Sequence, residues 1–174
     1  RASEVITRLR ELFAKKDVSA EPMDLNEATR EVIALSMSEL QRHGAVLRQE
    51  LADDLPAVTG DRVQLQQVIL NLLLNAADAM GEVNDRPRHV VIRTETEGAG
   101  TVRLSVRDVG VGLDPADLER VFDAFYTTKS TGMGIGLAIS RSIMERHHGR
   151  LWAAHNEGPG ATFAFSLPCA PRSQ

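Results

Sequence analysis

The chain has little of several things that mark other classes of protein. It contains one cysteine, Cys169, so no disulfide can form within it, and a lone thiol is typical of a reducing compartment. It has no signal peptide and no apolar run near the roughly 20 residues that a membrane-spanning helix requires. These absences predict a cytoplasmic domain, whether the intact protein is soluble or membrane-anchored.

Aromatic residues make up only 4% of the chain, and its formal net charge is −4. A nucleic-acid-binding protein is expected to show a basic patch or stripe, and none is visible, so nucleic acid is not an expected partner. Internal repeats and low-complexity tracts are absent as well. What is present is 174 residues that are 43% hydrophobic and 25% charged, which is enough for one sizeable core.

The longest regular segment is residues 61–80, DRVQLQQVILNLLLNAADAM, which lacks proline and glycine and predicts a helix of about five turns. Asp61 is a suitable N-cap, Gln64 stands where the reciprocal partner of a capping box belongs, and Gly81 is a suitable terminator. Apolar residues cover most of the cylinder, so we expect this helix to be buried.

Four polar residues of this helix share one side of it. At about 100° per residue, they fall within an arc of about 80°: Gln67, Asn71, Asn75 and Asp78. Buried polar side chains must be hydrogen-bonded or must face a ligand. They either satisfy neighbouring loops or line a binding site, and their alignment favours the site.

A second polar segment, Asp108-Val-Gly110-Val-Gly112, follows TVRLSVR, in which apolar and polar residues alternate as in a strand. A carboxylate at a strand end can accept the exocyclic amino group of adenine, and it would reject the carbonyl of guanine. The two glycines let the backbone approach a flat ring or turn sharply. The alternative is an ordinary strand-end aspartate followed by a glycine turn.

A third segment, Gly132-Met-Gly134-Ile-Gly136-Leu137, leads directly into a predicted helix that ends near Gly149. Bare amides at the start of a helix are suited to phosphate groups. No G-x4-G-K-[ST] motif occurs, and the glycines follow TTKST instead of an apolar strand, which argues against Walker-type NTPases and dinucleotide-binding folds. Together the three segments predict a nucleotide site.

The asparagine-bearing helix, D-x-G-x-G, FDAFYTTK, G-x-G-x-G-L and the closing GPGATFAFSLP occur in one fixed order. In this order they resemble the ATP-binding domain of sensor histidine kinases, part of the GHKL (Bergerat-fold) ATPase superfamily. The resemblance covers residues from about 23 to 168. The segments QVILNLLLNAADAM and FYTTK are most similar to those of the nitrogen-regulator and oxygen-sensor kinases.

The resemblance implies ATP and Mg²⁺ as cofactors and a role for each matching residue. Gln67 and Asn71 stand at catalytic positions, and Asn71 also stands at that of the Mg²⁺ ligand. Asp108 would read adenine with Thr162 as a water-linked helper, and Lys129 would meet the triphosphate. Phe122 and Phe125 also match ATP-site positions, but they can equally be packing residues. The further ATP-site matches are Asn75, Asp78, Gly110, Gly112, Phe122, Phe125, Thr127, Thr128, Gly132, Gly134, Gly136 and Leu137.

Three residues depart from the common pattern of this family. Val109 replaces an asparagine of many kinases, so any ligating or donating role of that side chain is absent. Asp78 replaces a basic residue and would oppose a triphosphate unless Mg²⁺ or a neighbour intervenes. Gln67 occupies the position where hydrolysing relatives place a glutamate that activates water. Since glutamine cannot act as a general base, this favours phosphoryl transfer over vigorous hydrolysis.

The elements predict an α/β (α+β) two-layer sandwich, with a mixed, largely antiparallel sheet covered on one face by three helices. A flexible ATP lid is expected between residues 113 and 131. Residues 1–20 would hold the end of a dimerisation helix and a linker, although a helix there can also be an extra core-packing element. Residues 21–168 would form the ATP-binding catalytic domain and residues 169–174 a tail. Helices are expected at 25–42, 61–80 and 137–149, and strands at 45–51, 89–96, 101–107, 150–156 and 161–167.

The phosphoacceptor of this family is a histidine followed by an acidic residue. None of the five histidines in this chain is followed by an acidic residue. We expect these histidines at the surface or, for His147 and His148, near a helix C-terminus. The resemblance thus implies a histidine kinase fragment that donates the γ-phosphoryl group of Mg·ATP to a histidine outside the chain. That histidine would lie on the helical hairpin of the same kinase, which would be a homodimer when intact. The phosphoryl group would then be relayed to the receiver domain of a response regulator. The alternatives are an ATPase switch of the chaperone or repair type, and a non-catalytic nucleotide- or partner-binding module.

Overall fold

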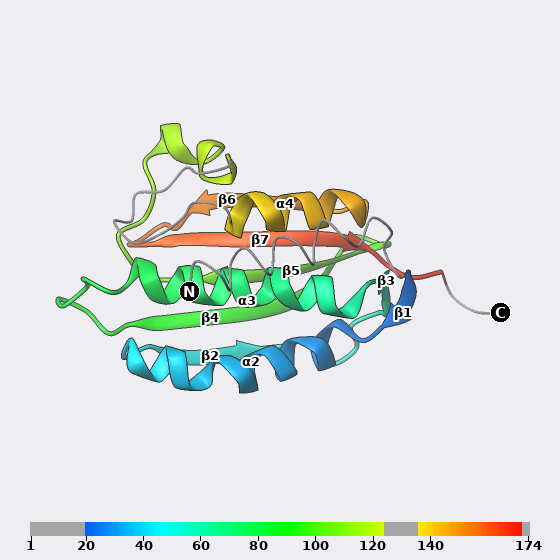
Figure 1. The fold of residues 1–174 in the computed structure, drawn as a ribbon, viewed down its shortest axis with the longest axis horizontal. Helices are drawn as coiled ribbons and strands as arrows, with labels where there is room; N and C mark the ends of the chain where they lie inside the picture. Colours follow the sequence, from blue (N-terminus) through cyan, green and yellow to red (C-terminus); the bar gives the residue numbers. More distant parts are fainter. Residues whose placement is uncertain (1–19, 124–135, 172–174) are drawn as a thin grey trace, which may run out of the picture.

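The computed structural model describes residues 20–123 and 136–171, which form two layers (Figure 1). Within these ranges one layer is a sheet in the order β2-β4-β5-β7-β6, in which β2 and β4 run parallel and the other neighbours antiparallel. The other layer is helical. The predicted two-layer sandwich is confirmed. Its elements are α2 (Leu25–Arg42), α3 (Arg62–Ala79), α4 (Gly136–Arg146), β2 (Val46–Glu50), β4 (His89–Glu97), β5 (Thr101–Arg107), β6 (Arg150–His155) and β7 (Ala161–Pro168).

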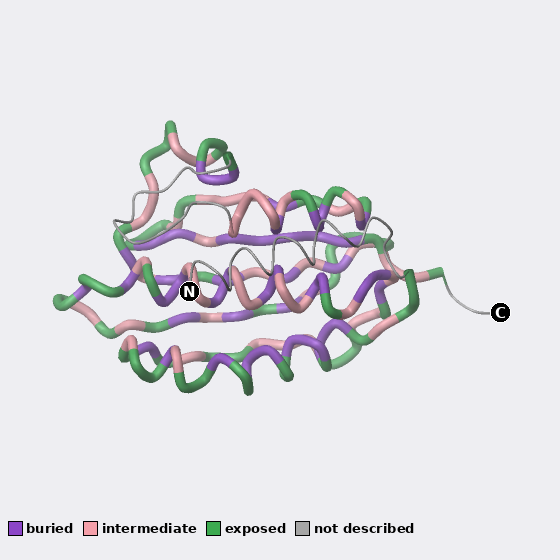
Figure 2. The backbone as a smooth tube through the Cα atoms, in the orientation of Figure 1, coloured by how far each residue is buried: buried purple, intermediate pink, exposed green. Residues whose placement is uncertain are grey.

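The strands place their apolar side chains under the helices and their charges on the open face. In β5, Val102 and Leu104 are fully buried, whereas Arg103 between them forms an ion pair with Glu95 on β4 at 2.5 Å. Because side chains alternate across a strand, this pattern gives β4 and β5 one face toward the core and one toward water, whereas β7 is buried on both faces over most of its length. Figure 2 shows an almost continuous buried stretch along β7.

A second, two-stranded sheet was not predicted. β1 (Glu21–Met23) pairs antiparallel with β3 (Val58–Gly60) beside the N-termini of α2 and α3. Val58 also forms an isolated antiparallel bridge with Cys169. These strands are only three residues long, too short for an alternating pattern in the sequence to reveal them. None of the described helices combines the length and apolar character needed to cross a membrane.

Helix α3 lies between α2 and α4 in the helical layer (Figure 1). Its inner face is fully buried, as for Leu65, Ile69 and Leu72. The prediction that apolar residues would enclose most of this helix is only partly right, because Val63 is 55% exposed and Leu70 is half-buried. The outer side of α3 is therefore open enough to present its polar residues.

The N-terminus of α3 differs from the predicted capping box. Asp61 is the N-cap, and its side chain accepts a hydrogen bond from the Gln64 amide at 3.2 Å. The Gln64 side chain, however, is buried without a hydrogen-bond partner among the described residues and does not return to Asp61. The amide of Asp61 donates instead to Nε2 of His147 at 3.0 Å. A residue at the end of α4 thus completes the cap.

His147 directly follows the last residue of α4 and is buried. Its Nδ1 lies 2.8 Å from the carbonyl oxygen of Ile143, one turn back in α4. Since Nε2 accepts from Asp61, Nδ1 must carry the proton, and the ring is held in its neutral form. The expected contact with a helix C-terminus is present.

The predicted leading helix and the predicted lid fall wholly or partly outside the described residues. The leading helix at residues 1–16 does so entirely. Of the segment from 113 to 131, residues up to 123 are described, and they form two short 3-10 helices, η1 (Pro115–Asp117) and η2 (Arg120–Phe122).

Substituting His147 by leucine is expected to lower the free energy of unfolding by about 1–3 kcal/mol, because the buried amide of Asp61 loses its acceptor. Burial lowers the pKa of His147 below its ordinary value of 6.5, so the unfolded chain takes up this proton at a higher pH than the folded one. Stability should therefore be retained above pH 6.5 and decline as the pH falls below it. Urea unfolding at several pH values would measure both effects.

His148→Asn is the matched control, since His148 is exposed and asparagine tolerates its positive φ of 61°. The leucine variant at position 147 should show a flatter acid limb than this control. An unchanged acid limb in that variant would contradict the assignment.

Candidate functional site

Four segments that are distant in sequence meet at one end of the sandwich, on the left of Figure 1. They are the C-terminal end of α3, the loop after β5, the turn before β7 and the start of α4. Gly110 lies against Ala79 of α3, and Gly160 lies against Asp108. Asn71 of α3 contacts Gly136 at the start of α4. The three motifs predicted to form a nucleotide site are therefore adjacent in their described parts.

Asp108 is deeply buried at this end of the molecule, with only 1% of its surface exposed. Its Oδ1 accepts hydrogen bonds from the amides of Gly110 at 2.9 Å and Ala161 at 3.2 Å. Its own amide donates to the Ala161 carbonyl at 3.0 Å. A buried carboxylate must be paired or hydrogen-bonded, and these amides hold it in one orientation at the end of β5.

The turn between β6 and β7 supports the same aspartate. Gly160 has φ +91°, and a Cβ there would overlap the carbonyl of Asp108. The side-chain amide of Asn156 donates to that carbonyl at 2.8 Å, and Thr162 Oγ1 donates to Asn156 Oδ1 at 2.5 Å. Thr162, the predicted helper of Asp108, therefore reaches its backbone through Asn156.

Gly110 allows the loop after β5 to pack on α3. A Cβ at this position would overlap the carbonyl of Ala79, and the amide of Val111 donates to that same carbonyl at 3.2 Å. This bond caps a carbonyl in the last turn of α3, which has no helical partner. Gly112, the second glycine of the motif, follows with φ +75° and lies beside Gly160.

Asn71 is oriented by the first turn of α4. Its Nδ2 donates to the carbonyl of Gly136 at 3.3 Å and to Ser140 Oγ at 3.0 Å. The amide nitrogen is thus committed to α4, and these bonds assign which end of the side chain is oxygen. Oδ1 is left as the atom that can address a cation or a ligand.

The other residues of the polar stripe diverge in their contacts. Gln67 and Asn75 are half-buried on α3, one turn before and one turn after Asn71. Asp78 is exposed, and its Oδ1 lies 3.5 Å from Nε2 of His43 at the C-cap of α2. The structure thus connects Asn71 with α4 and Asp78 with α2.

Phe122 is a packing residue in the described structure. It is 4% exposed and meets Phe163 of β7 edge to face at 6.2 Å between ring centroids. The guanidinium of Arg141 on α4 lies 5.1 Å from the centre of its ring. Leu137, at the start of α4, is partly buried against the core. Six further predicted ATP-site residues lie outside the described residues: Phe125, Thr127, Thr128, Lys129, Gly132 and Gly134.

The site offers a possible metal ion single oxygen ligands, such as Asn71 Oδ1, and not a cluster of acidic side chains. Among residues 20–123 and 136–171, no three histidine, cysteine or acidic side chains come together in a way that can hold a metal ion. Mg²⁺ suits such a site, because it keeps several waters and is commonly held by one or two protein oxygens together with substrate phosphates. The free end of the Asn71 amide fits that requirement.

Three residues of the site were missed in the sequence. Ser140 and Asn156 orient Asn71 and Asp108, and Arg86 donates to the carbonyls of Val109 and Gly110 at 2.7 and 3.0 Å. Each acts on a partner at least 23 positions away, so no local pattern reveals it. The only available signal was Asn156, which stands two positions before the first glycine of the predicted Gly-Pro-Gly turn.

Comparison with known proteins agrees with this geometry. The family model described as "Histidine kinase-, DNA gyrase B-, and HSP90-like ATPase" matches residues 60–171. The sensor protein FixL of Bradyrhizobium diazoefficiens is 38% identical over 170 residues, which is 98% of this chain and 33% of FixL.

Two solved kinases share the fold. Full-length ShkA in complex with AMPPNP has a TM-score of 0.78 at 28% identity, over 91% of this chain and 33% of that chain. The nucleotide-free catalytic domain of histidine kinase ThkA has a TM-score of 0.77 at 32% identity, over 87% of this chain and 96% of that domain. ThkA in complex with the response regulator protein TrrA has a TM-score of 0.76 at 27% identity, over 97% of this chain and 49% of that one.

The fold and the three adjacent motifs define an ATP-binding domain of the GHKL class. The chain belongs to the histidine kinase-, DNA gyrase B- and HSP90-like ATPase family, and the domain is of the kind found in two-component sensor kinases. The predicted resemblance is thus confirmed. The chain spans about a third of the length of FixL, so the activity of the whole protein is a separate question.

Gly160→Ala is expected to lower the free energy of unfolding by at least about 2 kcal/mol, from a strained positive φ and from overlap with the Asp108 carbonyl. It should also weaken nucleotide binding, because Asp108 must shift. Gly158→Ala is the control, since a Cβ there meets nothing within 4 Å and its φ is not positive. Thermal unfolding of both variants would decide; similar losses at the two positions would refute the close approach.

Proposed function

We propose that this chain is the ATP-binding catalytic domain of a two-component sensor histidine kinase, which donates the γ-phosphoryl group of Mg·ATP to a histidine outside the chain. The observation that carries the proposal is the buried carboxylate of Asp108. It lies at the end of β5, oriented by two backbone amides, beside a glycine loop that packs on α3. This arrangement offers a fixed acceptor for the amino group of adenine.

The phosphate end of the site would lie between α3 and the start of α4. Asn71 and Gly136 are in contact there, and amides at the N-terminus of a helix are suited to phosphate groups. We propose that Asn71 Oδ1 ligates Mg²⁺, which would neutralise charge on the phosphates. The carboxylate of Asp78 lies 3.5 Å from Nε2 of His43, at the C-cap of α2.

The acceptor histidine and the response regulator would come from outside this domain. No histidine of the chain is followed by an acidic residue, as the family's phosphoacceptor is. ThkA, which shares this fold, has been solved with the response regulator protein TrrA, and this supports a receiver domain as the final acceptor here. We further propose that the hairpin of the same kinase supplies the histidine and that the intact kinase is a homodimer.

Calorimetric titration of the chain with ATP, with and without Mg²⁺, tests the proposal. Asp108→Asn should lower ATP affinity by about tenfold or more, because it replaces an acceptor with an amide donor facing the adenine amino group. The asparagine oxygen can still accept from Gly110 and Ala161, so the unfolding temperature should change little. Absence of binding in the wild type at millimolar ATP would refute the proposal.

Asn71→Ala should remove most of the gain in ATP affinity that Mg²⁺ provides, a loss of about tenfold, while affinity in EDTA stays near that of the wild type. Ser140→Ala is the matched control, because it removes one support of Asn71 and keeps both the side chain and its bond to Gly136. It should retain most of the Mg²⁺ effect. Equal losses in the two variants would show that Asn71 is structural.

Gln67→Glu addresses the rival function, an ATPase switch. A carboxylate at this half-buried position can act as a general base, whereas the native amide cannot. We therefore expect slow hydrolysis in the wild type and an increase of about tenfold or more in the variant, measured as phosphate release. Rapid hydrolysis that the substitution leaves unchanged would favour the ATPase switch instead.

A further inference from the structure

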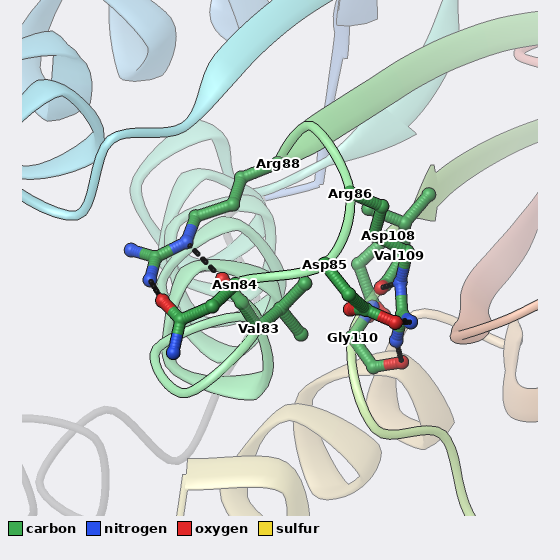
Figure 3. Close-up of polar contacts among 8 residues, drawn as sticks. All are labelled: Val83, Asn84, Asp85, Arg86, Arg88, Asp108, Val109 and Gly110. Atoms are coloured by element: carbon green, nitrogen blue, oxygen red, sulfur yellow. Dashed lines mark hydrogen bonds and ion pairs between the residues drawn. The ribbon is translucent and has the colours of Figure 1, made fainter.

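Arg86 holds the loop that carries the D-x-G-x-G motif, from a segment that the motif does not include. It lies in the connection between α3 and β4. Its Nε donates to the carbonyl of Val109 at 2.7 Å, and its Nη2 donates to the carbonyl of Gly110 at 3.0 Å. Figure 3 shows the guanidinium directed at these consecutive carbonyls, beside Asp108. A planar guanidinium is suited to such paired contacts.

These contacts determine the orientation of two peptide groups. The Val109 carbonyl and the Gly110 amide belong to one planar peptide group, so holding the carbonyl also aims the amide. That amide donates to Asp108 Oδ1 at 2.9 Å. The next peptide group is held in the same way, by Arg86 at the Gly110 carbonyl and by Ala79 at the Val111 amide. Arg86 is thus linked through one rigid peptide group to the carboxylate of Asp108.

Arg86 also has an acidic partner next to it in the connection between α3 and β4. Its Nη1 donates to both carboxylate oxygens of Asp85, at 3.1 and 3.2 Å. With Nε and Nη2 on carbonyls, the described contacts direct the guanidinium at protein groups. This arrangement indicates a positioning role through the backbone. It also shows how the loop is held without an asparagine at position 109, since the contact at Val109 is made by its main chain.

Arg88 provides an internal comparison. It lies two residues further along and also donates to carbonyls, those of Val83 at 2.9 Å, His43 at 2.6 Å and Gly81 at 3.1 Å. These carbonyls belong to the ends of α2 and α3 and to the connection itself. Figure 3 shows the two arginines directed to opposite sides of this connection. Arg88 therefore shares the chemistry of Arg86 and lacks its link to Asp108.

We infer that Arg86 is a positioning residue for base recognition, which holds the loop so that Asp108 selects a 6-amino purine over a 6-oxo purine. The inference rests on the proposed role of Asp108 and adds to it a distant determinant of specificity. Loss of the guanidinium would free the Gly110 amide to rotate, and the carboxylate would then lose part of its fixed orientation.

The test compares Arg86→Lys with Arg88→Lys, both of which keep the charge and lose the planar pair of donors. Dissociation constants for ATP and for inosine triphosphate, which carries a carbonyl at position 6, would be measured by calorimetry or competition. Arg86→Lys should weaken ATP binding about tenfold, with little change for inosine triphosphate. The preference for ATP over inosine triphosphate should therefore fall about tenfold. Arg88→Lys should leave the ratio near that of the wild type. If Arg86→Lys unfolds, Arg86→Gln, which retains one donor, replaces it.

A second readout needs no nucleotide. Hydrogen exchange at the Gly110 amide, followed by NMR in the free protein, should be several-fold faster in Arg86→Lys and unchanged in Arg88→Lys. An unchanged nucleotide ratio, or equal changes in both variants, would overturn the inference. If the wild type binds neither nucleotide, the proposed function fails and base selection with it, while the Gly110 exchange still reports whether Arg86 holds the loop.

Discussion

The end of the domain where we propose that nucleotide binds depends on the carboxylate of Asp108 and on the backbone amides that donate hydrogen bonds to it. Burying a charged group is unfavourable unless hydrogen bonds compensate, and here the amides of Gly110 and Ala161 provide them. One of these amides follows β5 and the other begins β7, so the same carboxylate joins neighbouring strands and the loop that packs on α3. Adenine recognition, as proposed, uses a side chain whose position the fold itself requires.

Helix α3 divides its surface between stability and binding. Its inner leucines are fully buried over the sheet, while Gln67, Asn71 and Asn75 stay half-exposed on the outer side. Neighbouring elements then determine what each polar residue can do. Asn71 gives its nitrogen to α4 and keeps its oxygen, whereas Asp78 faces His43 on α2. The acidic residue that looked unfavourable for a triphosphate is thus directed toward a different helix.

Prediction from sequence succeeded where short-range patterns decide the structure. The apolar alternation of β5 and the N-cap at Asp61 are local features, and both were found where expected. It failed where a distant residue competes for the same group. The amide of Asp61 donates its hydrogen bond to His147, which is 86 positions away, and not to the side chain of Gln64 as expected. Arg86 was missed for the same reason, since an arginine before a strand carries no sign of the carbonyls it will meet.

The sequence by itself determined the class of fold, the order of the nucleotide motifs and the absence of a histidine with an acidic successor. These follow from periodicity, glycine spacing and residue identity, which are all local properties of the chain. Only the tertiary structure decided the orientations: which end of Asn71 is free, which amides hold Asp108, and which arginine supports the loop. Hydrogen bonds between distant segments set these orientations, because their geometry exists only after the layers have packed.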